Sequence, residues 1–305
     1  MAAAATFDEA RTETSVFGAL LRARAKFGGK RDCIIDGDER RLTYDEIVRA
    51  SFGLGSALRK FARQGENVGV MLPTGAGAVI AFFALHAFGR VPAMLNFPAG
   101  ERSLKSALVL FTSGTEGEPK GVILSHKNII ANIEQVNAHI DLYESDIVFN
   151  PLPTFHCFGL TVGALMPIML GLRTVFHPTP LQAQTIVKRV RDTGATILLA
   201  TDTFISQYAR AGDQGDLNSV RLAVCGAERV RDETRALVRK KYNIEILEGY
   251  GVTEAAPVIA ANQIGANRNG TVGRLLPAME YKLVPVEGIA AGGRLLGTVF
   301  IGGRS

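Results

Sequence analysis

A segment rich in glycines and hydroxyl side chains carries the chemistry that is easiest to read from this sequence. It spans Leu110–Gly121, reads Leu-Phe-Thr-Ser-Gly-Thr-Glu-Gly-Glu-Pro-Lys-Gly, and follows a short apolar stretch at 108–111. Glycines let backbone N–H groups converge on an anion, hydroxyls add donors, and a lysine offsets negative charge. It is not a Walker A motif, because Pro119 stands where that motif needs glycine and Gly121 where it needs a hydroxyl. The segment predicts a phosphate-binding loop, although a bare Gly/Ser/Thr run is more often a surface turn.

The second candidate segment reads Glu-Gly-Tyr-Gly-Val-Thr-Glu and follows an expected strand. Gly249 and Gly251 would allow a tight turn with close backbone approach. Tyr250 offers a flat face to a purine, and Thr253 offers a hydroxyl to a phosphate. Glu254 supplies a hard oxygen ligand of the kind that Mg²⁺ prefers. Taken alone, the same residues could form a turn that leads into a buried segment.

Two further segments are weaker candidates for parts of a functional site. His156 lies in Pro-Leu-Pro-Thr-Phe-His-Cys-Phe-Gly, where it could face a substrate or be a histidine satisfied at the start of an apolar helix. Gly226, Ala227 and Glu228 follow an apolar strand, and a single glycine at a strand end proves little by itself.

Short apolar segments alternate with amphipathic ones along most of the chain, and a capping box, Thr43 with Glu46, opens the first amphipathic one. The expected strands are 67–72, 91–96, 108–111, 146–149, 173–176, 196–200, 222–225 and 245–248. The expected helices are 44–63, 75–88, 125–139, 181–193 and 230–242. This alternation predicts an α/β fold with layered, largely parallel sheets covered by helices, and ligands at the carboxyl ends of the strands.

The polar stretch 98–107 and a Gly-rich change of pattern after Gly265 suggest the domain organisation. We expect an N-terminal α/β subdomain at 1–100, a nucleotide-loop α/β subdomain at 101–264 and a small β-rich subdomain at 265–305. Strands are expected at 271–276, 280–284 and 297–301 in the last of these.

Composition excludes several classes of protein. The chain has 305 residues, 47% hydrophobic and 21% charged, with a formal net charge of +5, as is ordinary for a globular domain. Lysine and arginine occur in small dispersed groups, so we expect no nucleic-acid partner. Cys33, Cys157 and Cys225 are an odd, scattered set, which favours a reducing, cytoplasmic location. No signal peptide is evident, and the interrupted apolar run 155–172 predicts a buried helix rather than a membrane span.

Taken together, the segments resemble the paired nucleotide motifs of adenylate-forming (AMP-binding) enzymes, the acyl-CoA synthetase, peptide-synthetase adenylation and luciferase superfamily. The resemblance covers nearly the whole chain. The stretches 89–97, 251–257 and 270–277, together with Glu116, look closest to bacterial acyl–acyl carrier protein synthetases, whose domain is often fused to a 2-acylglycerophosphoethanolamine acyltransferase. The resemblance implies that this chain is the large N-terminal domain of an AMP-forming acid–thiol ligase that uses ATP and Mg²⁺.

The implied reaction activates a fatty acid as acyl-AMP and then transfers it to a phosphopantetheine thiol, of coenzyme A or of acyl carrier protein. The resemblance implies that the phosphates contact Thr112, Ser113, Gly114, Thr115, Gly117 and Lys120, and that the adenosine contacts Gly226, Ala227, Glu228, Gly249, Tyr250 and Gly251. Thr253 would hold the α-phosphate, Glu254 would bind Mg²⁺, and His156 would lie beside the acyl carboxylate. If the apolar run walls an acyl tunnel, a bulky residue at Gly163 should shorten the accepted chain.

The sequence departs from the family pattern in two places. The ribose-binding aspartate, the hinge and the small C-terminal lid domain with its lysine have no counterpart, and few residues separate the strand at 91–96 from the phosphate loop. We therefore expect nucleotide and acyl-adenylate binding with weak adenylation. The alternative is a non-catalytic nucleotide- or acyl-binding relative. An acyltransferase or hydrolase is disfavoured, because neither H-x-x-x-x-D nor G-x-S-x-G occurs. Peripheral association with the inner membrane, through a fused or separate acyltransferase, is the alternative to a purely cytoplasmic location.

Overall fold

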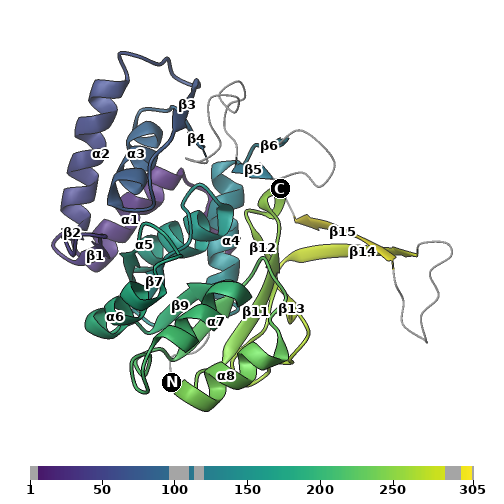
Figure 1. Ribbon diagram of the computed structural model, residues 1–305. Coiled ribbons are helices and arrows are strands. Elements are labelled where there is room, and N and C mark those ends of the chain that lie inside the picture. Colours follow the sequence, from purple (N-terminus) through teal and green to yellow (C-terminus); the bar gives the residue numbers. More distant parts are fainter. Residues whose placement is uncertain (1–5, 96–109, 113–119, 286–296, 304–305) are drawn as a thin grey trace.

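A computed structural model describes residues 6–95, 110–112, 120–285 and 297–303. A nine-stranded sheet with the order β13-β12-β11-β10-β9-β7-β8-β1-β2 runs through its centre (Figure 1). Its strands are β1 (Asp32–Ile35), β2 (Arg41–Thr43), β7 (Ile147–Asn150), β8 (Arg173–Phe176), β9 (Ile197–Ala200), β10 (Leu222–Cys225), β11 (Ile246–Gly251), β12 (Val258–Ala261) and β13 (Arg274–Leu275). The six strands from β11 to β1 are parallel, and β2, β12 and β13 are antiparallel additions at the two edges. The expected α/β fold with a parallel-rich sheet is confirmed.

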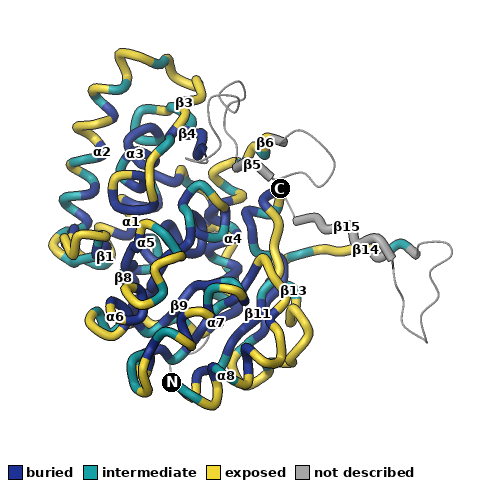
Figure 2. The backbone as a smooth tube through the Cα atoms, viewed as in Figure 1, coloured by how far each residue is buried: buried dark blue, intermediate teal, exposed yellow. Residues whose placement is uncertain are grey.

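Two hydrophobic cores cover the two faces of this sheet. One face packs against α6 (Ala183–Thr193), α7 (Asp202–Ala211) and α8 (Asp232–Tyr242), and the other against the remaining helices. These are α1 (Val16–Phe27), α2 (Tyr44–Leu58), α3 (Ala76–Ala87), α4 (His126–Asn137) and α5 (Met166–Leu170). Figure 2 shows the buried strands between exposed outer helix faces. No helix in the described ranges is both long and apolar enough to cross a bilayer.

Three two-stranded sheets complete the fold: β3 (Asn67–Val70) with β4 (Val91–Met94), β5 (Leu110–Thr112) with β6 (Lys120–Val122), and β14 (Met279–Pro285) with β15 (Gly297–Gly303). The last pair confirms the expected C-terminal β-rich region. The division of the chain at residues 100 and 264 stays a prediction.

Several expected elements differ from the structure. The helix expected to reach residue 63 ends at Leu58, and α1, α7, β1, β2, β6 and β12 were not expected at all. The apolar run expected to be one buried helix divides into a π-helical segment, Phe158–Leu165, and α5. The capping box at Thr43 is confirmed, since its side chain accepts from the backbone N–H of Glu46 and the Glu46 carboxylate accepts from that of Thr43.

A buried carboxylate ties three parallel strands together at their amino ends. Asp146, just before β7, accepts hydrogen bonds from Thr196 Oγ1 at 2.7 Å and from Arg221 Nε at 2.8 Å. Thr196 precedes β9 and Arg221 precedes β10. Burial alone would raise the pKa of Asp146, but the hydrogen bonds from Arg221 and Thr196 outweigh it and hold the pKa below its usual value.

We expect Asp146→Asn to lower the free energy of unfolding by about 2–3 kcal/mol near neutral pH, because it removes the charge that pairs with Arg221. The folded-state pKa is depressed, so the stabilisation is present above the unfolded-state pKa of about 4 and is lost as the pH falls through the folded-state value. Urea unfolding should show a wide gap between the stabilities of wild type and variant at about pH 7, and the gap should narrow as the pH falls below about 4. Asp192→Asn, in an exposed ion pair with Arg191, is the control and should change little. A gap that does not depend on pH would contradict this role.

Candidate functional site

Three of the segments singled out from the sequence converge beyond the carboxyl end of β11. The 3₁₀ turn Thr253–Ala255 follows that strand, and β5 packs against this turn. On the other side, Cys157 Sγ lies 3.5 Å from Thr253 Oγ1. Strand β5, the end of the second glycine segment and Cys157 of the histidine segment are therefore neighbours.

The candidate phosphate loop is bracketed by a hairpin. β5 and β6 pair antiparallel, with Thr112 opposite Lys120, so the backbone brings these two predicted phosphate contacts together. Ser113, Gly114, Thr115, Glu116 and Gly117 lie outside the described residues, and their roles stay predictions.

The second segment differs from its expected conformation. Gly249 and Tyr250 continue β11 and pair with Ala261 and Ala260 of β12. The tight turn expected at Gly249 and Gly251 was wrong, because β12 supplies hydrogen-bond partners that keep this stretch extended. The turn comes later, at Thr253–Ala255.

The close backbone approach expected at Gly251 is present. A Cβ built there would lie 2.3 Å from the carbonyl oxygen of Pro257. At the end of this strand Thr253 is buried, whereas Tyr250 and Glu254 are exposed. The hydroxyl of Thr253 is thus held by protein, and the ring of Tyr250 and the carboxylate of Glu254 remain open to a ligand.

Gly226 is buried at the carboxyl end of β10, and a Cβ there would lie 3.3 Å from the Phe158 ring and 3.7 Å from the carbonyl oxygen of Gly249. The structure therefore brings two of the predicted adenosine-binding glycines together. The Glu228 carboxylate accepts hydrogen bonds from Thr203 N at 3.1 Å and Thr203 Oγ1 at 2.9 Å, at the first turn of α7. Since this carboxylate is engaged by α7, the backbone of 226–228 is the part left to contact a base.

His156 and Cys157 open the π-helical segment. The backbone N–H of Phe158 donates to His156 Nδ1 at 3.4 Å, which orients the ring. His156 is exposed, yet the protein packed around its ring lowers the pKa below its usual value, so the imidazole is neutral at pH 7. Burial raises the pKa of Cys157, which stays a thiol in contact with Thr253. Cys157 was missed as a site residue, and its place directly after His156 was the available signal.

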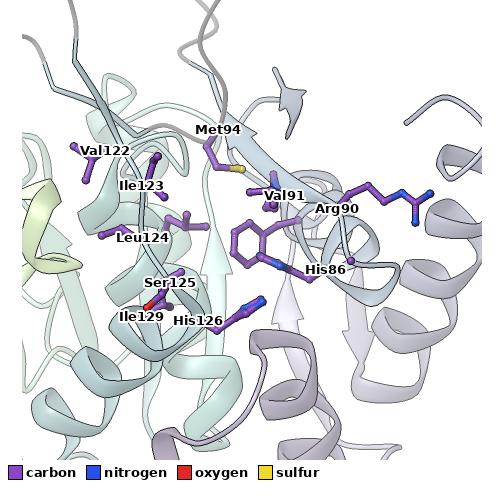
Figure 3. A pocket seen from close by; sticks show the side chains of 14 residues that line it. His86, Arg90, Val91, Met94, Val122, Ile123, Leu124, Ser125, His126 and Ile129 are labelled. Atoms are coloured by element: carbon purple, nitrogen blue, oxygen red, sulfur yellow. The ribbon is translucent and has the colours of Figure 1, made fainter. Parts of the chain in front are cut away.

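An apolar pocket of about 330 Å³ lies one helical turn beyond His156 (Figure 3). Leu160, whose backbone N–H donates to the carbonyl oxygen of His156 at 2.9 Å, forms part of its wall. The other walls come from α3 and β4 and from the stretch between β6 and α4, including Phe82, Met94, Val122, Leu124 and Ile129. The side chains of Met94, Leu124 and Ile129 gather around it in Figure 3.

Two histidines close one end of this pocket. The rings of His86 and His126 lie 4.9 Å apart, and His126 Nδ1 accepts a hydrogen bond from the backbone N–H of Val16. Burial and the neighbouring His126 lower the pKa of His86 to about 3. Burial also lowers the pKa of His126. Both rings are neutral at pH 7, so this end of the pocket carries no charge.

The structure corrects the expectation for Gly163. A Cβ at this glycine would lie 2.2 Å from Asn150 Nδ2, so Gly163 packs on the end of β7 and not on the pocket. The pocket was not predicted, because nothing in the sequence of its walls, including the stretch 89–97 singled out for family resemblance, indicated that they enclose a cavity.

The residues present fit a magnesium ion that is held mostly by a nucleotide. In the described ranges there is no cluster of three or more His, Cys, Asp or Glu side chains that could hold a metal ion by themselves. Glu254 is exposed at the converging segments. Mg²⁺ commonly takes one or two carboxylates and completes its coordination with phosphate oxygens and water. One exposed carboxylate in the turn that packs against β5, the strand before the predicted phosphate loop, would match that pattern.

Comparisons with known proteins agree with this fold and site. A family model described as AMP-binding enzyme matches residues 21–108 and 98–305. The long-chain-fatty-acid–CoA ligase of Escherichia coli O6:H1 is 32% identical over 184 residues, which cover 58% of this chain and 33% of that protein. The chain thus matches about a third of the length of such a curated relative.

Solved structures show the same fold at lower identity. A long-chain-fatty-acid-CoA ligase, FadD1, from Archaeoglobus fulgidus aligns with a TM-score of 0.83 at 19% identity, over 98% of this chain and 76% of that one. ATP-bound MatB from Rhodopseudomonas palustris aligns with a TM-score of 0.81 at 19% identity, over 95% and 70% of the two chains. The fold and the family match define the class: this chain belongs to the AMP-binding enzyme family. Enzymes of this family use ATP.

Proposed function

We propose that this chain provides the acyl-adenylate site of an ATP-dependent fatty-acid ligase. The observation that carries the proposal is a series of neighbouring residues: Thr253 contacts Cys157, Cys157 follows His156, and Leu160, one turn later, lines the apolar pocket. These contacts support a site in which the predicted nucleotide-binding segment lies beside a cavity suited to an alkyl chain. Mostly apolar pockets of a few hundred Å³ are typical ligand sites.

In the reaction that we propose, a fatty carboxylate attacks the α-phosphate of ATP, pyrophosphate leaves, and acyl-AMP remains. A phosphopantetheine thiol then attacks the acyl carbonyl carbon, which releases AMP and gives a thioester. The chain acts by positioning and by neutralising charge. The pocket binds the alkyl chain, neutral His156 lies beside the carboxylate, and Thr253 donates to the α-phosphate from a position fixed by Cys157. Thr112, Ser113, Gly114, Thr115, Gly117 and Lys120 would contact the phosphates, and Glu254 would bind Mg²⁺, which would offset their charge.

The relatives that are named CoA ligases favour coenzyme A as the thiol acceptor. Acyl carrier protein, which carries the same thiol, is the other acceptor to be tested. A cytoplasmic location with peripheral attachment to the membrane remains part of this proposal.

The experiment is a calorimetric titration of the chain with non-hydrolysable acyl-adenylate analogues of short and long acyl chains, beside AMP and free fatty acid. We expect the long-chain acyl-adenylate analogue to bind much more tightly than either AMP or free fatty acid. Leu124→Trp, which fills the pocket, should weaken the long analogue about tenfold or more and leave AMP unchanged. Leu181→Trp, at an exposed leucine away from the pocket, is the matched control.

Failure of a folded sample to bind the long-chain acyl-adenylate analogue would refute the proposed site. ATP–pyrophosphate exchange by the same sample separates a working ligase from a relative that only binds nucleotide or acyl groups.

A further inference from the structure

The end of α2 presents an exposed phenylalanine between cations. Arg59, Lys60, Phe61, Ala62 and Arg63 form a turn between α2 and β3, which we call the basic corner (Figure 1). The side chain of Phe61 is 85% exposed, the largest value among the exposed large hydrophobic residues of the described chain. Arg59, Lys60 and Arg63 are exposed as well. An isolated exposed leucine needs no explanation, but a phenylalanine with so large an exposed fraction, flanked by three cations, is unusual.

The cations of the basic corner have no ion-pair partner in the described part of the chain. Among the described residues, none of its three cations has a carboxylate within ion-pair distance. The nearby Glu66 carboxylate instead accepts a hydrogen bond from the backbone N–H of Arg63 at 2.7 Å. The corner therefore carries a local positive charge around an apolar ring.

The basic corner is also held in place. The Arg90 guanidinium donates to the carbonyl oxygen of Ala62 at 2.7 Å and to that of Arg59 at 3.2 Å. Backbone hydrogen bonds from Lys60 to Ala57 and from Phe61 to Leu58 extend the turn of α2. Leu54 and Ala57, in the last turns of α2, are exposed like Phe61. Phe61 thus stands in a turn that hydrogen bonds hold in place, with cations beside it.

We propose that the basic corner docks on an anionic lipid bilayer, with Phe61 inserted among the lipids and the three cations at the headgroup phosphates. The match is chemical: an aromatic ring gains from leaving water at the interface, and each nearby lysine or arginine gains from the negative surface potential. A protein partner would need a concave apolar acceptor for a protruding ring, whereas a bilayer accepts one anywhere on its surface.

The position of the basic corner gives docking a consequence, which rests on the proposed function. Arg90, which holds the corner, also lines the apolar pocket together with Gly89 and Val91. Docking would bring the proposed acyl pocket close to the lipid that contains fatty acids.

The test is cosedimentation of the full 305-residue chain with vesicles of phosphatidylcholine, alone or mixed with phosphatidylglycerol, at low and high salt. We expect binding to the mixed vesicles only, weakened by salt. Phe61→Ser should lower the partition constant about tenfold, and Lys60→Gln and Arg63→Gln about fivefold each. Leu181→Ser and Lys188→Gln remove an exposed leucine and an exposed lysine elsewhere and should bind as wild type.

Three outcomes would overturn the proposal: no binding by a folded sample, equal binding to neutral vesicles, or equal loss in the control variants. Sedimentation velocity adds a fourth, because a dimer that Phe61→Ser dissociates would make the corner a contact between copies of the chain. None of these results depends on acyl-adenylate binding, so this proposal and the proposed function can fail separately.

Discussion

Gly251→Ala is expected to lower the affinity of this chain for an acyl-adenylate analogue on the order of a hundredfold, whereas Gly53→Ala, in α2, leaves it nearly unchanged. A Cβ at Gly251 would lie 2.3 Å from the carbonyl oxygen and 2.9 Å from the carbonyl carbon of Pro257. Both are backbone atoms, so no change of rotamer relieves the overlap. Thr253 lies between Gly251 and Pro257 in the chain. Any backbone shift that accommodates the added methyl group therefore also moves the Thr253 hydroxyl.

The Gly53 variant is the control. A Cβ at Gly53 would meet no heavy atom within 4 Å, and this exposed glycine of α2 is not among the predicted ligand contacts. Calorimetry with the analogue measures the affinity, and thermal unfolding verifies that each variant is folded. Wild-type affinity in a folded Gly251→Ala variant, or an equal loss in both variants, would show that the strand end does not position the ligand-binding groups.

The sequence predicts the strand–helix alternation well where side-chain periodicity decides the structure. The expected boundaries of β8 and β10 match the structure residue for residue, and the stripe of Ile186, Val187 and Val190 in α6 is fully buried. Burial of one face of a helix or of both faces of a central strand leaves a clear pattern along the chain.

The errors arise where tertiary partners decide the structure. Glycines at 249 and 251 suit a turn or a strand equally, and only the pairing of β11 with β12 selects the strand. The pocket was not predicted for a related reason. In the sequence, Phe82, Leu124 and Leu160 resemble ordinary core residues, and only the fold brings them together around a cavity. Glu248 is a third case, because it heads a motif with nucleotide-binding features and yet is buried.

Glu248 joins β11 to α8 rather than facing the site. Its carboxylate accepts a hydrogen bond from the backbone N–H of Val230 at 2.9 Å and pairs with the guanidinium of Arg235. Arg235 also donates to the carbonyl oxygen of Ile246 at 3.1 Å. Both side chains are buried, at 5% exposure for Glu248 and 9% for Arg235. Removing one charge therefore leaves the other without a partner in a region that excludes water.

We expect Arg235→Met to lower the free energy of unfolding by about 3–5 kcal/mol, because it leaves the Glu248 carboxylate buried and unpaired. The double variant Arg235→Met/Glu248→Gln should cost less than Arg235→Met alone, since no buried charge remains and the glutamine oxygen can still accept from Val230. Arg239→Met, at an exposed arginine of the same helix, controls for the loss of a cation from α8 and should change little. Urea unfolding of these variants forms a double-mutant cycle once Glu248→Gln is added.

Additive effects in that cycle, or equal midpoints for Arg235→Met and Arg239→Met, would contradict the pairing. A large coupling would mean that the first residue of the second segment holds β11 against α8, whereas Tyr250 and Glu254 in the same segment are exposed. Structural and ligand-facing residues would then occupy consecutive parts of one short motif, which explains why its spelling alone could not separate the two roles.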